Sequence, residues 1–432
     1  MSIIADLLSD TAIPEFFPVR QTFPEDALDD LPAAVAAALS ASGIQDLAPS
    51  GGEVAIGVGS RGIAGLPALV RSTVRWFAEK GCRPFIVPAM GSHGGATGPG
   101  QAAMLAELGV TEQSAGCEIR ASMDVVQIGT LDNGLPVYMD ALAWNADGVF
   151  VINRVKPHTS FSGPNESGIV KMLTIGLGKQ KGADAAHRLG NLHFATIMPA
   201  MTRMIIEKKK GLLGALAVVE NALDKTCLVE AVPAAKIAER DAELLLYARS
   251  RMPSLPLKQI DLLIIDRVGK NISGAGMDPN ITGRHGSTAK TGGPDVSRLV
   301  VLGLTPESKG TATGIGVADI IPRSLADGIN YAYSYANVIT STNLVYMRQP
   351  MTLDTDEEVL RCGVKTCGAQ TGSLRAIRIR DTLTLDRMYV SKAAADALCG
   401  APSCRVAERA VSFAFNARGE LDTDDWNWPR SV

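Results

Sequence analysis

The chain has 432 residues, of which 46% are hydrophobic and 20% charged, and its formal net charge is −3 with the five histidines neutral. This length indicates two or three domains, and the balanced charge excludes a broad basic surface for nucleic acid or an anionic membrane. A site for an anionic ligand must therefore be local and built from few residues.

The N-terminal sequence has no basic leader followed by an apolar segment, which argues against a secretory signal. The longest apolar candidate, residues 31–44, is interrupted by Pro32 and Gly43 and is too short to cross a bilayer. We therefore expect a cytoplasmic protein, with neither membrane nor nucleic acid among its partners. The seven cysteines are scattered without a close zinc-site spacing, so we expect reduced thiols.

Short apolar runs rich in β-branched residues alternate with amphipathic segments along the chain. The expected strands are, in chain order, residues 54–58, 84–87, 125–128, 148–152, 216–219, 262–265, 299–302 and 344–346. The expected helices are residues 66–80, 101–108, 195–208 and 235–249. This alternation predicts an α/β protein with mostly parallel sheets whose strands are buried on both faces.

A proline-containing segment, residues 251–257, follows a helical pattern and precedes a new strand, so we place a domain boundary near residue 256. Residues 1–256 and 257–432 are thus expected to form two α/β domains, with the active site in the cleft between them. The polar tail after about residue 405 carries Trp426 and Trp428. It either packs back on the first domain or stays loose.

Polar and basic residues follow three of the expected strands. Ser60 and Arg61 come after the first strand, His93 lies in a Gly-Ser-His-Gly-Gly sequence after the second, and His158 comes after the fourth. Ligands bind beyond the carboxyl ends of strands in open α/β sheets, so two histidines placed there can share one pocket. The planar fork of an arginine suits a carboxylate or a phosphate. Taken singly, each histidine is equally explained as a loop residue and the arginine as a surface ion-pair partner.

The segment 162–190 carries a lysine and a histidine behind a start rich in small residues. A helix is expected to begin near Ser167, where free backbone N–H groups favour a phosphate or another anion. Lys171 would lie about one turn inside this helix among apolar neighbours, which disfavours its charged form and suits covalent chemistry. His187 follows sixteen residues later, and imidazole is a suitable ligand for nickel, copper, zinc or iron. The alternative for Lys171 is an ordinary solvated helix lysine.

Together these motifs resemble the lactate racemase family. The resemblance rests on Ser-Arg at 60–61, Gly-Ser-His at 91–93, Pro-His-x-x-Phe-Ser-Gly at 157–163, and a lysine followed by a histidine sixteen residues later. It covers most of the chain and is strongest between residues 57 and 190. In that family the lysine forms a thioamide with a pyridinium dithio-nucleotide. The nucleotide binds nickel through two sulfurs and one ring carbon, and a histidine completes the coordination.

The resemblance implies a role for each residue of these motifs. Lys171 would carry the nickel-pincer nucleotide (pyridinium-3,5-bisthiocarboxylic acid mononucleotide nickel), and His187 would ligate its nickel. His93 and His158 would be the paired acid and base, and Arg61 an active-site arginine. The remaining cofactor contacts would come from Ser60, Ser162, Gly163 and Gly168. The implied partners are a small-molecule 2-hydroxy acid and the proteins that make and insert the cofactor.

Departures from the family pattern point to a changed substrate pocket. Residues 164–166 lengthen the loop before the lysine, and Val58 stands where the family often has an acidic residue. In the expected second domain the family's substrate loop is altered around residues 283–286, with Lys270, Arg284 or His285 as candidate replacements. We therefore expect a 2-hydroxy acid larger than lactate, such as a sugar acid or a hydroxy-diacid.

The sequence thus predicts an isomerase, a racemase or epimerase that inverts C2 of a 2-hydroxy acid. The proton on C2 is barely acidic, so removal and return of a hydride by a cofactor avoids an unfavourable deprotonation. Two histidines would exchange the roles of base and acid. Two other hypotheses stay open: a metal-free aldolase or dehydratase with Lys171 as a Schiff-base residue, and a non-catalytic anion- or cofactor-binding protein.

Overall fold

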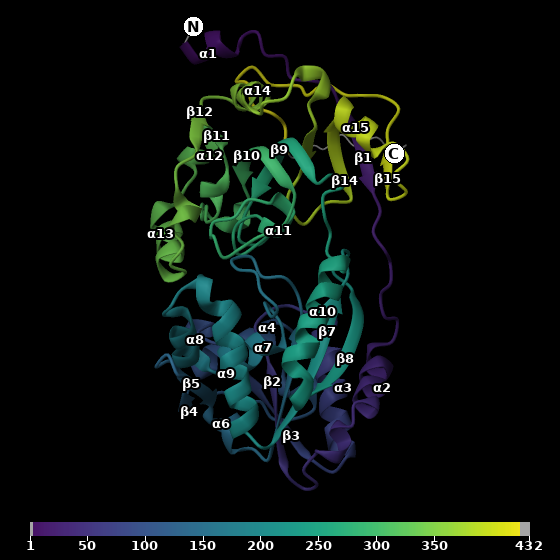
Figure 1. Cartoon of the computed structure of the whole chain (residues 1–432), viewed down its shortest axis with the longest axis vertical. Coiled ribbons are helices and arrows are strands. Elements are labelled where there is room, and N and C mark those ends of the chain that lie inside the picture. The colour runs from purple at the N-terminus through teal and green to yellow at the C-terminus, as the bar shows by residue number, and fades with distance from the viewer. Residues whose placement is uncertain (1–2, 424–432) are drawn as a thin grey trace. The chain divides into compact units, whose positions relative to one another are not determined.

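The computed structural model describes residues 3–423, and the chain divides into two units. The first unit, residues 24–252, is built on a sheet with the strand order β3-β2-β6-β7-β8 (Figure 1). Neighbours from β3 to β7 are parallel, and β8 joins β7 antiparallel. These strands are β2 (Glu53–Val58), β3 (Arg83–Pro88), β6 (Gly148–Arg154), β7 (Leu212–Glu220) and β8 (Thr226–Pro233). A separate antiparallel pair consists of β4 (Val125–Thr130) and β5 (Pro136–Asp140).

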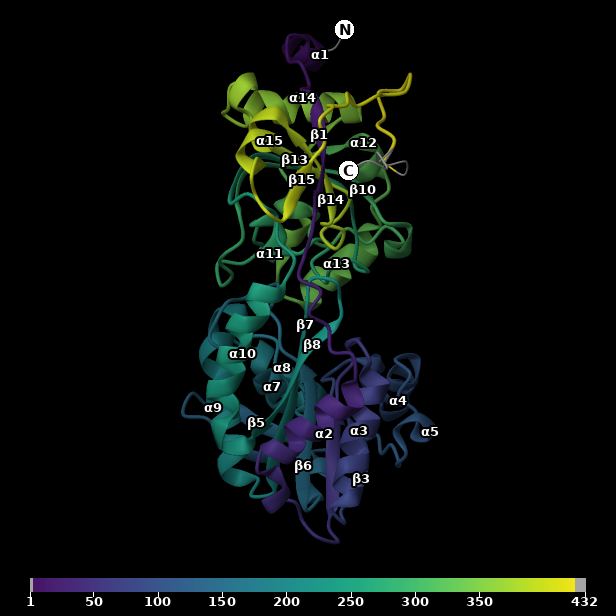
Figure 2. The same ribbon diagram turned by 90° about the vertical axis from the view of Figure 1, so that its right-hand side faces the viewer.

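Helices cover both faces of this sheet (Figure 2). They are α2 (Leu31–Ala41), α3 (Leu66–Glu79), α4 (Gly98–Glu107), α5 (Glu112–Ala115), α6 (Ala141–Asn145), α7 (Ile169–Lys171), α8 (Lys179–His187), α9 (Phe194–Lys208) and α10 (Ile237–Arg251). Successive side chains of a strand point to opposite faces. Accordingly Ile56 of β2 joins the core under α2 and α3, whereas a side chain at Gly57 would meet Leu177 from the opposite layer. Both faces are buried, which explains the continuous apolar character of β2.

The second unit combines residues 3–23 with 253–423 around an eight-stranded sheet of order β12-β11-β10-β9-β13-β14-β1-β15. Strands β12 to β13 are parallel along this order, and the last three pairings are antiparallel. The strands are β1 (Phe16–Gln21), β9 (Gln259–Val268), β10 (Asp295–Leu304), β11 (Ile320–Pro322), β12 (Met351–Leu353), β13 (Ala376–Ile379), β14 (Arg387–Ser391) and β15 (Cys404–Val406).

Two apolar layers hold the helices of the second unit to its sheet. Leu262 of β9 packs with Leu360 on one face, and Leu263 of the same strand packs with Leu325 and Leu398 on the other. The helices are α1 (Ile3–Leu8), α11 (Pro279–Thr282), α12 (Arg323–Asp327), α13 (Tyr331–Thr340), α14 (Asp356–Thr366) and α15 (Lys392–Leu398). Both units are therefore α/β, with mostly parallel sheets, as the alternation of the sequence predicts.

Seven of the eight expected strands are present within a few residues of their expected bounds. The prediction for residues 344–346 was wrong, because they form part of a 3-10 helix, Leu344–Met347. Tyr346 is buried in a small cluster with Ala275 and Val338, so its apolar character reflects burial rather than a strand. A short apolar run in the sequence does not distinguish a strand from a buried helical segment.

The expected domain assignment needs correction at the N-terminus. The first unit ends at Met252, close to the expected boundary near 256, but residues 3–23 belong to the second unit. There β1 pairs with β14 and β15, and its Phe16 stacks on Phe413 with ring centroids 4.4 Å apart. The described part of the tail therefore packs within the second unit rather than on the first domain. Trp426 and Trp428 lie outside the described residues.

Among residues 3–423, no helix combines the length and the apolar character that a membrane crossing requires. The seven cysteines are free thiols, as their scattered spacing predicts.

Candidate functional site

Three neighbouring parallel strands of the first unit end at the same edge of the sheet. β2 lies between β3 and β6, and the chain continues from these strands into the segments that carry Ser60 and Arg61, His93, and His158. The carboxyl ends of adjacent parallel strands form the usual ligand-binding edge of an α/β sheet. The topology therefore brings these four residues, which come from three distant segments of the sequence, to one edge.

Ser60 and His93 are in direct contact at this edge. The Ser60 hydroxyl is 2.5 Å from Nδ1 of His93, so Nε2 is the ring nitrogen that can meet a ligand. Part of the His93 surface is exposed. Packing around the imidazole nevertheless lowers its pKa, and the positive charges of Arg61 and Lys171 lower it further. A lowered pKa keeps His93 neutral near pH 7, which is the form that accepts a proton.

His158 is held by a closed loop. Lys156 and Ser167 exchange two backbone hydrogen bonds of 2.8 and 3.2 Å, which close the loop at its base. Inside it the buried Glu166 carboxylate accepts from the backbone N–H groups of His158, at 2.6 Å, and of Gly163, at 3.1 Å. Glu166 also forms an ion pair with Arg249 of α10.

The tautomer of His158 follows from one contact. The backbone N–H of Ser160 donates to Nδ1 of His158 at 3.0 Å. Nδ1 is therefore unprotonated, and in the neutral ring the proton is on Nε2. His158 is thus prepared as a donor, whereas the low pKa of His93 favours an acceptor.

Lys171 ends the short helix α7 and is followed directly by a π-helix, Met172–Gly176, whose residues are all buried. π-helical turns are rare and are frequent at functional sites. Asn153, the penultimate residue of β6, donates to the Gly168 carbonyl at 2.6 Å and connects the helix start to the sheet edge. Lys171 therefore has a fixed backbone beside the strand ends.

The start of α7 does not offer the anion site that the sequence predicts. The buried Asp241 carboxylate of α10 already accepts from the backbone N–H of Ile169 at 2.7 Å and from the Asn165 side chain at 3.1 Å. A Cβ added at Gly168 would lie 2.1 Å from Asp241 Oδ1, so this glycine admits the chain's own carboxylate. Asp241 occupies the donors on which the prediction of a bound anion rested, so that prediction was wrong. The role of Gly168 as a cofactor contact stays a prediction.

The Lys171 side chain is shielded from solvent and lies near two other cations. Burial lowers its pKa to about 8 from the ordinary 10.5, and the charges of Arg61 and Lys156 contribute to the shift. A larger fraction of its amine is therefore neutral near pH 7 than in an ordinary lysine. Desolvated lysines beside other cations are the lysines used for covalent catalysis.

His187 lies at the end of α8 and belongs to a row of aromatic rings. Its ring centroid is 4.9 Å from that of Phe194, which is 5.2 Å from Phe161, which in turn is 4.5 Å from His158. Burial and the charge of Lys171 lower the pKa of His187, and Asp184 opposes them. The rings and charges thus place His187 on the same site as Lys171 and His158. A neutral imidazole is the form that ligates a metal.

Within the part of the chain that the structure describes, no group of three or more His, Cys, Asp or Glu side chains is placed to hold a metal ion. A metal at His187 would therefore need further ligands from a bound molecule.

The two predicted substrate residues of the second unit have partners of their own. The Arg284 guanidinium forms a bidentate pair with Asp319, at 2.6 and 3.3 Å, and donates to the Ser297 carbonyl at 2.9 Å. It anchors its own loop, and its role as a substrate ligand stays a prediction. The Lys270 ammonium donates to the Asn337 side chain and lies in an exposed loop after β9. An ammonium has three donors, so Lys270 stays a candidate.

Sequence reasoning missed the residues that support the site rather than face a ligand. The sequence identifies Glu166 only as part of a loop insertion, and it singles out neither Asp241 nor Lys156. Nothing in a single sequence distinguishes a buried acid from a solvated one, because both occur among polar neighbours.

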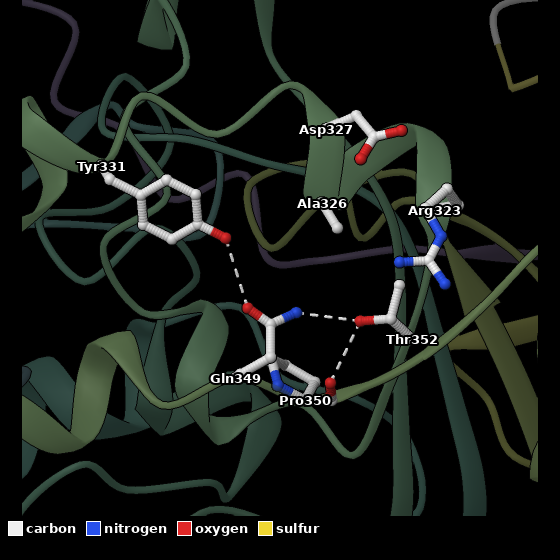
Figure 3. Close-up of a pocket in the computed structure, with 7 residues that line it drawn as sticks. All are labelled: Arg323, Ala326, Asp327, Tyr331, Gln349, Pro350 and Thr352. Atoms are coloured by element: carbon white, nitrogen blue, oxygen red, sulfur yellow. Dashed lines mark hydrogen bonds between the residues drawn. The ribbon is translucent and has the colours of Figure 1, made fainter.

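A surface hollow of about 670 Å³ lies in the second unit (Figure 3). The Tyr331 hydroxyl and the Gln349 side chain meet there at 3.4 Å, and Gln349 donates to Thr352 at 2.9 Å. Arg323 and Asp327 complete its polar lining. The strand-end residues described above lie in the other unit, so we do not assign the candidate site to this hollow.

Fold and site together define a two-unit α/β protein in which a lysine of lowered pKa and three histidines gather beside strand ends. No family model and no curated protein matches the sequence. Among solved structures, the chain is similar to the lactate racemase apoprotein from Thermoanaerobacterium thermosaccharolyticum, at 17% sequence identity and a TM-score of 0.44. The match covers 86% of this chain and 89% of that one.

Proposed function

We propose that this protein is an isomerase that inverts the configuration at C2 of a 2-hydroxy acid and that it carries a nickel-pincer nucleotide on Lys171. One observation carries the proposal: the lowered pKa of Lys171, in a site shared with Arg61, His93 and His187. The motif resemblance to lactate racemases supports it independently of the geometry.

The residues present fit the proposed group. An amine that is partly neutral near pH 7 suits an acyl-type bond at Lys171. A single imidazole, His187, suits a metal whose other ligands belong to the nucleotide, and the described residues offer no competing metal cluster. Arg61 and Lys156 supply positive charge for the nucleotide's phosphate or for a substrate carboxylate. Ser60, Ser162 and Gly163 remain proposed contacts at the strand ends.

The proposed group would accept a hydride from C2 of the substrate and return it to either face. The protein would control the proton of the substrate hydroxyl. His93, neutral at pH 7, would accept this proton at Nε2 while Ser60 fixes its Nδ1 side. His158 would present its Nε2–H to the opposite face, and the two would exchange roles in reverse. Arg61 would orient the carboxylate.

A second function draws on the same observation. A lysine with a pKa of about 8 also suits a metal-free aldolase or dehydratase that forms a Schiff base. Borohydride with a 2-keto acid would trap such an adduct on Lys171 as a secondary amine. The chain would gain the mass of the keto acid less one oxygen atom, because water leaves when the imine forms and two hydrogens enter on reduction. A nucleotide mass with stoichiometric nickel favours the isomerase instead.

The decisive experiment uses the full chain coexpressed with proteins that synthesise the nickel-pincer nucleotide. We expect a covalent mass increase on Lys171, about one nickel per chain, and racemisation of a 2-hydroxy acid. Substrate deuterated at C2 should keep its label in the product, because a hydride does not exchange with water. Lys171→Ala should lose all three signals, whereas Lys181→Ala, at an exposed lysine of α8, should keep them. A nucleotide adduct that persists in Lys171→Ala would refute the tether.

A further inference from the structure

A buried polar network lies beneath the loop that carries His93. The Lys179 ammonium contacts Asp140 at 3.0 Å, and both side chains are fully buried, with 0% exposure. It also donates to the Pro88 carbonyl at 2.5 Å and to the Gln101 side-chain oxygen at 3.0 Å. The ammonium thus joins the end of β3, helix α4 and the end of β5.

Gln101 extends the network into the His93 loop. Its side-chain amide donates to the carbonyls of Gly91, at 2.8 Å, and of His93, at 3.2 Å. Lys179 holds the loop where it leaves the sheet, at Pro88, and Gln101 holds it at its far end. The backbone N–H of Gly91 donates to Gly176 at 3.1 Å, which fixes the middle against the π-helix after Lys171. The loop is therefore held at Pro88 and Gly91 by buried contacts and at His93 by a partly buried one.

This arrangement lowers the free energy of unfolding relative to an apolar alternative. Lys179 has a φ of +53°, a left-handed backbone conformation that residues other than glycine rarely adopt. A buried ion pair is often no more stable than a well-packed apolar pair, because both charges lose their hydration. Strained backbones and buried networks of this kind are concentrated at functional sites. Stability alone therefore gives no reason to retain Lys179 and Asp140.

We propose that Gln101, Lys179 and Asp140 are positioning residues that hold the Pro88–His93 loop so that the His93 imidazole stays on Ser60 and turned toward the site. The catalytic consequence of this proposal rests on the proposed function, since His93 is there the proton acceptor. Its structural content is independent of that function. Loss of the network should free the loop and change the surroundings of the His93 ring.

The first test substitutes Gln101→Met, which keeps the volume and removes both donations to the loop. The matched control is Thr73→Val in α3, which removes a buried hydrogen bond to Leu69 in the same unit but away from the loop. In the loaded enzyme we expect kcat to fall about 10- to 100-fold with little change in KM, because misplacing a reacting group by about 1 Å can cost on the order of 10²-fold. In a His93→Asn background the same substitution should cost nothing further.

The second test reads the histidine directly. The full chain, labelled at histidine nitrogens, is titrated by NMR with and without Gln101→Met, and the His93 signal is assigned by its loss in His93→Asn. We expect the His93 pKa, which lies below the ordinary 6.5 in the native protein, to move toward that value. Should Gln101→Met fail to fold, the double variant Lys179→Met with Asp140→Asn removes the charges as a pair and serves in its place.

The outcomes separate the two proposals. A shifted His93 titration in a chain without racemase activity would support positioning and refute the proposed function. Unchanged titration, together with a kcat loss that adds to that of His93→Asn, would overturn the positioning role while leaving the function intact. A Thr73→Val control that reproduces the effects of Gln101→Met would likewise overturn it.

Discussion

Lys171 should behave as an unusually reactive amine even before any cofactor is attached. Its pKa falls to about 8 from 10.5 through burial, then through the charges of Arg61 and Lys156. At pH 7 an amine of pKa 8 is about 10% neutral, and one of pKa 10.5 is only about 0.03% neutral. The neutral fraction is therefore about 300-fold larger for Lys171. Restricted access lowers this advantage, because the side chain is partly buried, so we expect at least a tenfold faster acylation.

The assay is trace acetylation of the unloaded full chain at a series of pH values, with peptide mass spectrometry to follow each lysine. The midpoint for Lys171 should lie near pH 8. Arg61→Gln should raise this midpoint by less than one unit, because burial is the largest cause and remains. Arg75→Gln, at an exposed arginine of α3, is the matched control and should leave it unchanged. A midpoint near 10.5 would refute the assignment of Lys171 as the reactive lysine.

Three further predictions concern the loaded enzyme. His187→Ala should lower nickel content while the nucleotide mass stays on the chain, and His193→Ala, at an exposed histidine nearby, should retain nickel; the reverse result would move the ligand. His93→Asn and His158→Asn should each reduce turnover by about 10²–10⁴-fold with mass and nickel intact, as expected for a positioned acid or base; full activity in either variant would remove that residue from the mechanism. A substrate screen should favour a 2-hydroxy acid larger than lactate, and a wide preference for lactate would contradict the predicted change in the substrate pocket.

The placement of residues at strand ends was predictable, because hydrophobic runs identify buried strands and parallel strands end at one edge. Ser60, His93 and His158 follow β2, β3 and β6, and the sheet order makes these three strands neighbours. The order itself was not predictable, since pairing depends on long-range contacts. Sequence spacing alone gave no sign that β2 is central.

The supporting residues show where sequence reasoning stops. Lys179 is one of several charged residues in a glycine-rich stretch, and its complete burial depends on Asp140, thirty-nine positions earlier. The mistaken anion site at the start of α7 has the same origin. Its donors are satisfied by Asp241, which lies seventy-two positions beyond Ile169. A local sequence pattern shows which backbone N–H groups lack a partner within the helix. Only the fold shows which distant carboxylate accepts from them. The N-terminal segment joined the second unit for a similar reason, because β1 finds its partners near the opposite end of the chain.

Asp241 leads to a last prediction, which needs no cofactor. Burial raises the pKa of this carboxyl to about 6 from 3.8, against the opposing hydrogen bonds from Ile169, Asn165 and Val170. The folded state thus binds more protons than the unfolded state between these values, so stability should fall as pH rises from about 4 to about 6. Two pKa units correspond to about 3 kcal/mol, as an order of magnitude for this fully buried group.

Asp241→Asn should remove this slope, because an amide does not titrate. Relative to the variant, the native chain should be about 3 kcal/mol more stable at pH 4 than at pH 7. Hydrogen exchange of β6 peptides in urea reports the first unit separately from the second and is the appropriate measurement. Glu239→Gln, at an exposed residue of the same helix, is the control and should keep the native slope. Parallel pH profiles for Asp241→Asn and the native chain would show that the carboxylate at the start of α7 is ionised throughout. In that case the carboxylate that accepts from the start of α7 would stay charged down to pH 4.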